Sequence, residues 1–369
     1  MSDMSKMKSF QWLDFSVVNE RNKYHNAWIE SLSKRPHDHP GFLEMMKPAL
    51  YRPFAVIYQH SSSSRIIYPF YCCCLKDFPA FSDLNTSYMH MVSPYGYGGP
   101  LYEGLQSEHQ ETSIAFEKIF NDELSKRDFV SEFVREDIFS ERLAIRSSGT
   151  LVEQQPNVVV RLQRSDEDIW RTYKAKVRKN VNRANEFLLN IKFDRDGEYL
   201  AQFIEIYYET MKRTAASKNF MIPEEKFRNI TETLGHEGGV MYVHISDGER
   251  IVSSEMLLLS PDTIYSFLGG TLEGAFEKRP NDLLKHEVVQ WGRKNGFKWY
   301  VLGGGLTPLD GIFRYKQAFD PESIFPFYVR KNIVNPDIYQ SLVAKRCSFE
   351  SGVGNNWIAR PDFFPEYLS

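Results

Sequence analysis

Residues 250–319 contain the pattern that decides the fold, and they read RIVSSEMLLLSPDTIYSFLGGTLEGAFEKRPNDLLKHEVVQWGRKNGFKWYVLGGG followed by LTPLDGIFRYKQAF. Two apolar runs with the composition of strands come first, at Ile251–Leu259 and Thr263–Gly269. A helical run at Leu283–Lys294 follows, and a third strand at Lys298–Leu302 closes on three glycines. The stretch therefore predicts a strand–strand–helix–strand unit.

The start of the predicted helix has the chemistry of an anion site. Gly269 and Gly270 carry no side chain, so they let the backbone come close to a ligand. Pro280 suits a first helical turn, which Asn281 and Asp282 help to open. A helix start presents free N–H groups and the positive end of the helix dipole. We therefore expect this joint to suit a phosphate group.

The order of these elements resembles the acyl-donor half of the GNAT acyltransferase superfamily. The pyrophosphate loop of that superfamily, with its Arg/Gln-x-x-Gly-x-Gly/Ala pattern, is replaced here by EKRPNDLL. The following GGGLTPLDGIFRYKQAF resembles the glycine-rich turn and the F-x-x-F-K-x-x-F-like ending of the FemAB family, and keeps Phe313, Tyr315, Lys316 and Phe319. Members of that family join two GNAT-like domains and transfer aminoacyl or acyl groups onto cell-envelope precursors.

The resemblance runs from Ser93 to Phe319 and implies a mixed α/β (α+β) fold with two tandem GNAT-like domains. We place an N-terminal, acceptor-side domain at residues 1–150 and a C-terminal, donor-side domain at residues 151–334. The polar, turn-rich segment Ser147–Pro156 marks the boundary between them. The tail, residues 335–369, carries aromatic side chains that need a surface to cover, so we expect it to pack back on the first domain.

Composition is that of a soluble globular protein. The 369 residues, 42% hydrophobic and 25% charged, can bury a large core and divide into two domains. A net charge of −3 gives the whole molecule no attraction to nucleic acid or to an anionic membrane, so we expect no DNA partner. The polar start and the lack of an 18-residue apolar run predict a cytoplasmic protein without a membrane span. Four cysteines fit a reducing compartment.

A segment rich in glycine and proline, HMVSPYGYGGPL at residues 90–101, is the most unusual composition of the first half. Its Tyr95 and Tyr97 supply flat apolar faces with hydroxyl ends. A tight structural turn is one interpretation. The wording also resembles the turn that closes the acceptor side of the cleft in FemAB-like proteins, which implies a ligand-binding role.

Residues 170–186 read WRTYKAKVRKNVNRANE and are strongly basic. Arg171, Lys174 and Arg178 recur at three- and four-residue spacing, which predicts a basic stripe on one helical face. Such a stripe is usually a solvated face, yet the segment from Arg171 to Arg183 holds six basic side chains and no acidic one. FemAB-like proteins have a similar stretch in which basic groups face a phosphate-bearing substrate, and arginine suits a diphosphate.

Acyl transfer of this kind needs no nucleophile from the enzyme, because the acceptor amine attacks the ester or thioester directly. Lys316, beside a glycine-rich strand end, is the candidate for charge stabilisation, against the alternative of an ordinary surface lysine. Glu255 lies on the strand that often carries the base in GNAT-like enzymes, and it could equally be paired and inert. Asp310 is a further candidate, for amine binding. The candidate substrate-binding residues are Tyr95, Tyr97, Tyr173, Arg178, Arg183, Arg279, Asn281 and Tyr315.

Three functions remain open from the sequence. The first is a bacterial aminoacyl- or acyltransferase that takes its acyl group from acyl-CoA or from aminoacyl-tRNA, with tRNA as a partner, and acts on a sugar nucleotide or an envelope (peptidoglycan-type) precursor. The second is an acyl-CoA-dependent acetyltransferase of a small free amine. The third is a non-catalytic binding protein with a degenerate GNAT fold, which the missing pyrophosphate loop favours. No metal is expected, since KHEVVQ at residues 285–290 lacks the second histidine of H-E-x-x-H.

Overall fold

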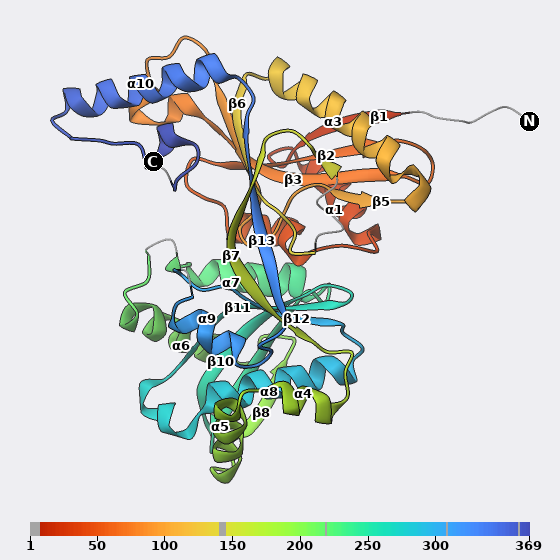
Figure 1. The fold of residues 1–369 in the computed structure, drawn as a ribbon, viewed down its shortest axis with the longest axis vertical. Helices are drawn as coiled ribbons and strands as arrows, with labels where there is room; N and C mark the ends of the chain where they lie inside the picture. The colour runs from red at the N-terminus through yellow and green to blue at the C-terminus, as the bar shows by residue number, and fades with distance from the viewer. Residues whose placement is uncertain (1–7, 140–144, 218–219, 308, 361) are drawn as a thin grey trace, which may run out of the picture. The chain divides into compact units, whose positions relative to one another are not determined.

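The computed structural model describes residues 8–139, 145–217, 220–307, 309–360 and 362–369. The chain divides into two compact units, and both are assembled from segments far apart in the sequence (Figure 1). Unit 1 comprises Met1–Ser33, Met46–Gln154 and Phe327–Ser369, and unit 2 comprises Lys34–Met45 and Gln155–Pro326.

Unit 1 is a mixed sheet with helices packed on it. Its strands pair in the order β1-β2-β3-β4-β6-β13, with β5 beside β3. The β4–β6 pair is parallel, and the other pairs are antiparallel. The elements are β1 (Ser9–Asp14), α1 (Val18–Glu30), β2 (Arg52–Gln59), β3 (Arg65–Cys74), β4 (Met89–Val92), β5 (Leu101–Glu103), α3 (His109–Lys126), β6 (Phe129–Arg135), β13 (Ile324–Ile333) and α10 (Pro336–Gly352).

The last residues of the chain help to build the core of unit 1. Tyr367 is fully buried, and it joins Tyr339 of α10 in an apolar cluster with Cys73 of β3 and Phe81. Cys72, the neighbour of Cys73, belongs to a different cluster on the other face of the sheet. Adjacent thiols on one strand therefore point apart, as the strand period predicts.

Unit 2 has strands in the order β7-β12-β11-β10-β9-β8. The β11–β12 pair is parallel, and the others are antiparallel. The elements are α2 (Pro40–Met45), β7 (Thr150–Arg161), α4 (Asp166–Thr172), α5 (Ala175–Glu186), β8 (Asn190–Asp194), α6 (Leu200–Arg213), α7 (Glu224–Ile230), β9 (Val240–Asp247), β10 (Arg250–Leu259), β11 (Thr263–Thr271), a short 3₁₀ helix (Glu273–Lys278), α8 (Pro280–Lys294), β12 (Trp299–Gly303) and α9 (Gly311–Gln317).

The strand–strand–helix–strand unit predicted from the sequence is present as β10, β11, α8 and β12. Residues Ile251–Leu259 of β10 are all buried, because sheet neighbours flank the strand and helices cover it; such a strand reads as a continuous apolar run. Helix α8 begins with Pro280 at its first position, after Arg279 in the left-handed conformation with φ 57°.

The prediction of one continuous basic helix in residues 170–186 is wrong. Helix α4 ends at Thr172 and α5 begins at Ala175, with the backbone extended between them. The break lets Tyr173 turn inward, where its ring lies 5.4 Å from that of Phe319. Arg178 then reaches back, and its Nη1 donates to the carbonyl oxygens of Tyr173 and, at 3.1 Å, Arg171.

Within the described part of the chain, no helix combines the length and the apolar character that crossing a bilayer requires.

Candidate functional site

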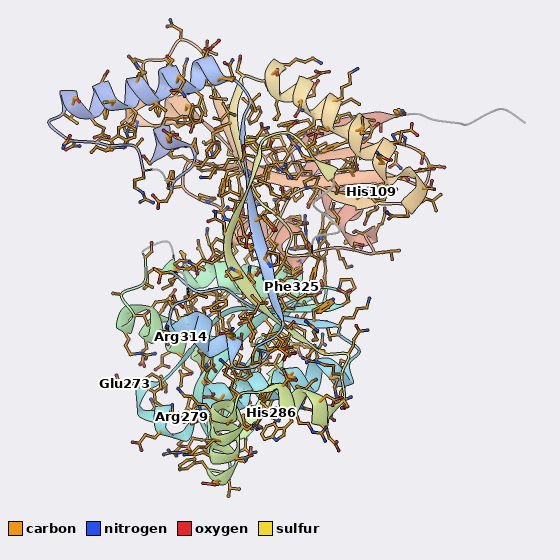
Figure 2. The ribbon with its side chains drawn as sticks, in the orientation of Figure 1. His109, Glu273, Arg279, His286, Arg314 and Phe325 are labelled. Atoms are coloured by element: carbon orange, nitrogen blue, oxygen red, sulfur yellow. The ribbon has the colours of Figure 1, made fainter. Side chains whose placement is uncertain are left out.

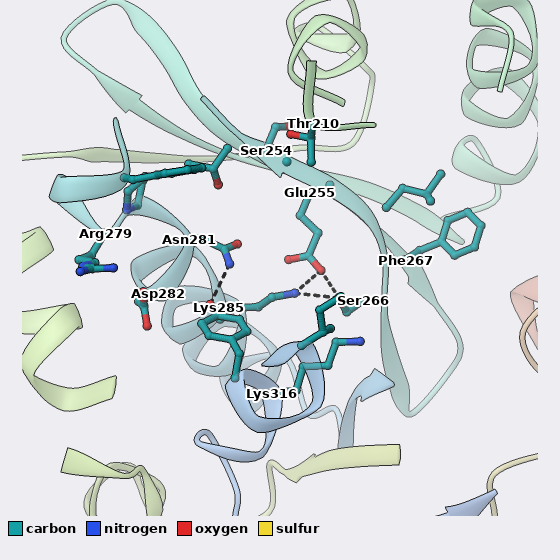
Figure 3. Close-up of a pocket in the computed structure, with 18 of the residues that line it drawn as sticks. Thr210, Ser254, Glu255, Ser266, Phe267, Arg279, Asn281, Asp282, Lys285 and Lys316 are labelled. Atoms are coloured by element: carbon teal, nitrogen blue, oxygen red, sulfur yellow. Dashed lines mark hydrogen bonds and ion pairs between the residues drawn. The ribbon is translucent and has the colours of Figure 1, made fainter. Parts of the chain in front are cut away.

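A pocket of about 470 Å³ opens in unit 2 where β10, β11, α8 and α9 meet (Figure 3). Figure 3 shows Glu255 and Lys285 facing each other in the pocket, with Lys316 nearby and Arg279 toward the start of α8. The polar side chains among its lining residues are Thr210, Arg213, Ser254, Glu255, Ser266, Thr271, Arg279, Asn281, Asp282, Lys285, Tyr315 and Lys316. Five of the residues predicted from the sequence therefore meet here: Glu255, Arg279, Asn281, Tyr315 and Lys316.

The floor of the pocket is a buried hydrogen-bonded ion pair. Lys285 Nζ donates to Glu255 Oε1 at 2.5 Å, to Ser266 Oγ at 2.7 Å and to Tyr300 Oη at 3.2 Å. Glu255 also accepts from Ser266 Oγ, and its Oε2 accepts from Tyr300 Oη at 3.3 Å. A bulge that places Phe267 opposite no single residue of β10 lies beside this pair. All three protons of the ammonium are used, and Glu255 is paired with Lys285; its catalytic role stays a prediction.

Lys316 stands on α9 beside this floor. Its Nζ donates to Gly304 O at 2.7 Å, and the turn that presents this carbonyl begins at Gly303 with φ 81°. Phe313 and Phe319 flank it in sequence and are buried, which anchors the segment as expected. Burial lowers the pKa of Lys316 to about 8, and the positive charge of Lys285 adds to that effect. One N–H of the Lys316 ammonium is bound to Gly304, the other two remain available, and its pKa of about 8 lies near physiological pH.

The start of α8 forms the other side of the pocket. Arg279 precedes the helix, and Asn281 Nδ2 donates to Tyr315 Oη at 2.8 Å, which ties α8 to α9. Asp282 Oδ1 accepts from Asn180 Nδ2 at 3.1 Å, and burial raises the pKa of the Asp282 carboxyl. Arg213, from the end of α6, lies with its guanidinium carbon 4.9 Å from the centre of the Phe276 ring. Two arginines and a helix N-terminus therefore border this side.

Gly269 and Gly270 are needed for the close packing of β11 against neighbouring elements. A Cβ atom at Gly270 would lie 2.2 Å from Thr210 Oγ1 on α6, and one at Gly269 would lie 2.7 Å from the carbonyl oxygen of Ser254. The two glycines thus let β11 lie close to α6 and β10 while they line the pocket.

Four candidate residues of unit 2 lie outside the lining of the pocket. Asp310 caps α9, where its oxygens accept from the backbone N–H groups of Phe313 at 2.8 Å and Leu306 at 2.7 Å; these bonds lower its pKa. Tyr173 is buried, and its hydroxyl lies 3.4 Å from Nδ1 of a histidine on α8, His286, which Figure 2 labels. Arg178 caps α4, and Arg183 is exposed on α5.

Two candidates, Tyr95 and Tyr97, belong to unit 1. Tyr97 is buried, and its ring lies 5.7 Å from that of Phe327. Tyr95 is 38% exposed. Both roles in substrate binding stay predictions.

Sequence reasoning missed Lys285, Ser266 and Arg213 as parts of the pocket. One signal was available, because Asn281 and Lys285 are four residues apart on α8 and therefore lie on one face of the helix. Nothing in the sequence places the end of α6 beside α8.

Comparison with known proteins agrees with this architecture. Residues 171–317 match the family model described as acetyltransferase (GNAT) domain. No curated protein matches the chain in sequence.

Solved structures resemble nearly the whole chain. The crystal structure of FemX has a TM-score of 0.63 and 11% identity, covering 86% of this chain and 97% of FemX. The C-terminal domain of a proposed lysylphosphatidylglycerol synthetase from Agrobacterium fabrum has a TM-score of 0.53 and 10% identity, covering 91% and 97%. A conserved protein of unknown function from Bacteroides thetaiotaomicron has a TM-score of 0.52 and 11% identity, covering 88% and 100%. These similarities confirm the mixed α/β fold of the tandem GNAT type.

Proposed function

We propose that this chain transfers an acyl group from acyl-CoA to an amine of a cell-envelope or polysaccharide precursor, because residues 171–317 match the model of the acetyltransferase (GNAT) domain. The observation that carries the proposal is the pocket of unit 2, which combines the N-terminus of α8 with the buried Lys285–Glu255 pair and Lys316. The N-terminus of α8 can bind phosphate, and the Lys316 ammonium can bind a carbonyl oxygen. Together they suit a donor that carries a diphosphate and a reactive carbonyl.

The donor is proposed to lie with its diphosphate at the start of α8. The free N–H groups of the first helical turn and the guanidinium groups of Arg279 and Arg213 supply positive potential there. They do so without the glycine-rich loop of the superfamily, which EKRPNDLL replaces.

The reaction is a direct transfer. The amine nitrogen of the acceptor attacks the carbonyl carbon of the thioester, the C–N bond forms and the C–S bond breaks. The nitrogen gives up a proton, and the thiolate of the leaving group takes one up. Lys316 is proposed to stabilise the negative charge that develops on the carbonyl oxygen, since one of its three protons is bound to Gly304 and the others are available.

Glu255 and Asp310 are proposed to act through other groups. Glu255 holds Lys285 in the floor of the pocket, and Asp310 holds the start of the helix that carries Lys316. The acceptor side is proposed to lie in residues 1–150, with Tyr95 and Tyr97 in contact with substrate, and the donor side in residues 151–334. The fold shared with FemX and with the synthetase domain favours an envelope precursor as the acceptor.

An aminoacyl-tRNA donor is a second candidate, and the basic surface near α5 favours it. Lys174, Lys176, Lys179 and Arg183 are exposed, and none of the four forms an ion pair among the described residues. Such a surface suits a polyanionic carrier, whose binding weakens steeply as salt rises.

The test is a thermal-shift titration with acetyl-CoA and with tRNA. A donor at about 100 times its dissociation constant adds about 2.7 kcal/mol to the stability of the folded chain. Arg279→Met should weaken acetyl-CoA binding about tenfold, since it removes a charge-assisted contact. Arg293→Met is the matched control, because Arg293 lies in the last turn of the same helix and pairs with Asp166.

The outcomes separate the two donors from a chain that binds neither. Stabilisation by acetyl-CoA that depends on Arg279 supports the acyl-CoA proposal. Salt-sensitive stabilisation by tRNA alone would replace it with the aminoacyl-tRNA alternative. A chain that responds to neither ligand would be the non-catalytic binding protein.

A further inference from the structure

Arg135, at the end of β6 in unit 1, contacts backbone and aromatic groups among the described residues. Its Nη1 donates to the carbonyl oxygen of Ser93 at 3.4 Å, and its backbone N–H donates to Ser93 Oγ at 2.8 Å. Its guanidinium carbon lies 5.1 Å from the centre of the Phe133 ring and 6.0 Å from that of Tyr95. No carboxylate of the described residues forms an ion pair with it.

Three other buried or half-buried arginines of unit 1 are paired with a carboxylate. Arg146 Nη1 lies 2.8 Å from Glu132 Oε1, Arg330 Nε lies 2.7 Å from Glu136 Oε1, and Arg65 Nε lies 2.7 Å from Glu103 Oε2. These three arginines each have a carboxylate partner, whereas Arg135 has none among the described residues.

Aromatic rings lie beside the guanidinium of Arg135. Burial lowers the pKa of its guanidinium, and the groups that oppose this effect are the hydroxyls of Tyr95, Tyr71 and Tyr51, which are neutral at physiological pH. The cation thus bears the cost of desolvation without a counter-charge. An anion that binds beside it would remove that cost.

We propose that Arg135 and the adjoining loop Ser93–Pro100 form a binding site for an oxyanion, either a carboxylate or a phosphate, carried by the acceptor substrate. A planar guanidinium flanked by rings keeps its N–H edge available for two oxygen atoms. The loop contacts the Arg135 side chain through the carbonyl oxygen of Ser93 and turns at two glycines with positive φ, Gly96 at 89° and Gly99 at 87°. The half-exposed ring of Tyr95 forms a wall from the same loop.

The assignment to the acceptor rests on the proposed function, whereas the anion site itself does not. It adds a chemical requirement to that function: the amine-bearing substrate also carries a negative charge. A small amine without a carboxylate or phosphate would lack the oxyanion that is proposed to bind Arg135.

The experiment maps the reaction of arginines with phenylglyoxal by peptide mass spectrometry on the whole protein. An anion at about ten times its dissociation constant leaves about a tenth of the sites free, so modification of Arg135 should slow about tenfold. Inorganic pyrophosphate and glutarate are the two probes, and they distinguish a phosphate source from a carboxylate source. Arg127 is the internal control, because it also lies over an aromatic ring, 4.6 Å from the centre of Trp12, but pairs with Glu123.

Slower modification of Arg135 with either probe, at an unchanged rate for Arg127, is the expected result. Equal rates with and without both probes would overturn the proposal. Arg135→Met provides the second measurement, made in the Arg279→Met background so that pyrophosphate bound at the start of α8 contributes little. We expect a melting temperature equal to or above that of the parent variant, with loss of the probe's stabilising effect. A lower melting temperature with that effect intact would make Arg135 a structural support of the loop.

The result is independent of the donor test. Protection of Arg135 in a chain that acetyl-CoA does not stabilise would keep the anion site and remove the acyl-CoA function. Stabilisation by acetyl-CoA without protection of Arg135 would keep the acyl-CoA function and remove the anion site.

Discussion

Lys316 differs from an ordinary surface lysine in two respects that bear on its proposed catalytic role. Its ammonium is fixed by Gly304, and its pKa of about 8 lies well below the usual value. A half-buried cation beside a second lysine is unfavourable in the free protein, and negative charge that develops on a substrate would relieve it. The residue is therefore suited to act in the transition state more than in the ground state.

Replacing Lys316 by methionine tests this role. Lys316→Met keeps much of the aliphatic stem and removes the charge, so we expect kcat at saturating substrate to fall about 10²- to 10³-fold, as for the loss of one oxyanion donor. Lys298→Met, which removes an exposed lysine paired with Asp262, is the control. An unchanged kcat in folded Lys316→Met protein would leave the donor side without its main residue.

The pH dependence gives the same test a second measurement. The ammonium is present below pH about 8 and is lost above it, so the activity of the wild type should decline above pH about 8 and that decline should be absent in Lys316→Met. The contribution of Lys316 to folding stability changes with pH in the opposite direction to the activity. Because the unfolded chain binds the proton more tightly, the contribution of this group to stability rises with pH from about 8 to 10.5.

Single residues were predictable where a motif carried them. Lys316 and its buried neighbours Phe313 and Phe319 follow from the ending of the pattern at residues 303–319. The proposed anion site at Arg135 was not predictable. What distinguishes this arginine is that no carboxylate of the described residues pairs with it. Such a property depends on which side chains the sheet brings together across many residues.

At the scale of elements, the close approach of β11 to α6 is the feature most open to test. Gly270→Ala would place a Cβ 2.2 Å from Thr210 Oγ1 and 2.8 Å from Ile206 O, so one element must move. We expect a loss of about 1–3 kcal/mol in the free energy of unfolding, typical of overpacking, together with weaker donor binding. Gly274→Ala is the control, since its Cβ would meet no atom within 4 Å. Equal stability of the two variants in urea would show that α6 can yield.

Elements with a clear period were predictable to within a few residues. Strands β10, β11 and β12 and helix α8 match the predicted ranges, because apolar runs and a proline at the helix start are local signals. The break between α4 and α5 was not predictable, since it depends on the burial of Tyr173 against Phe319, 146 positions later in the numbering. A distant contact overrode the local preference for one helix.

At the scale of the whole molecule, the end of the chain carries a share of the stability of unit 1. Tyr367→Ala removes a fully buried ring that lies 5.2 Å from that of Tyr339, and it breaks the 2.7 Å hydrogen bond to Ser131. We expect a loss of about 3–5 kcal/mol, as for other buried aromatic residues. Ile358→Ala, at a side chain 75% exposed, should change stability by less than about 0.5 kcal/mol. Denaturation in urea measures both.

The division of the chain among the two units has a consequence for its synthesis. Every segment of unit 2 precedes Phe327, whereas unit 1 needs Phe327–Ser369 to complete its sheet through β13 and its core through Tyr367. Until residues 327–369 are made, unit 1 therefore lacks the strand that pairs with β6 and the side chains that complete its apolar core. During that interval unit 1 exposes an unpaired strand edge and apolar side chains, which are features that favour aggregation and bind chaperones.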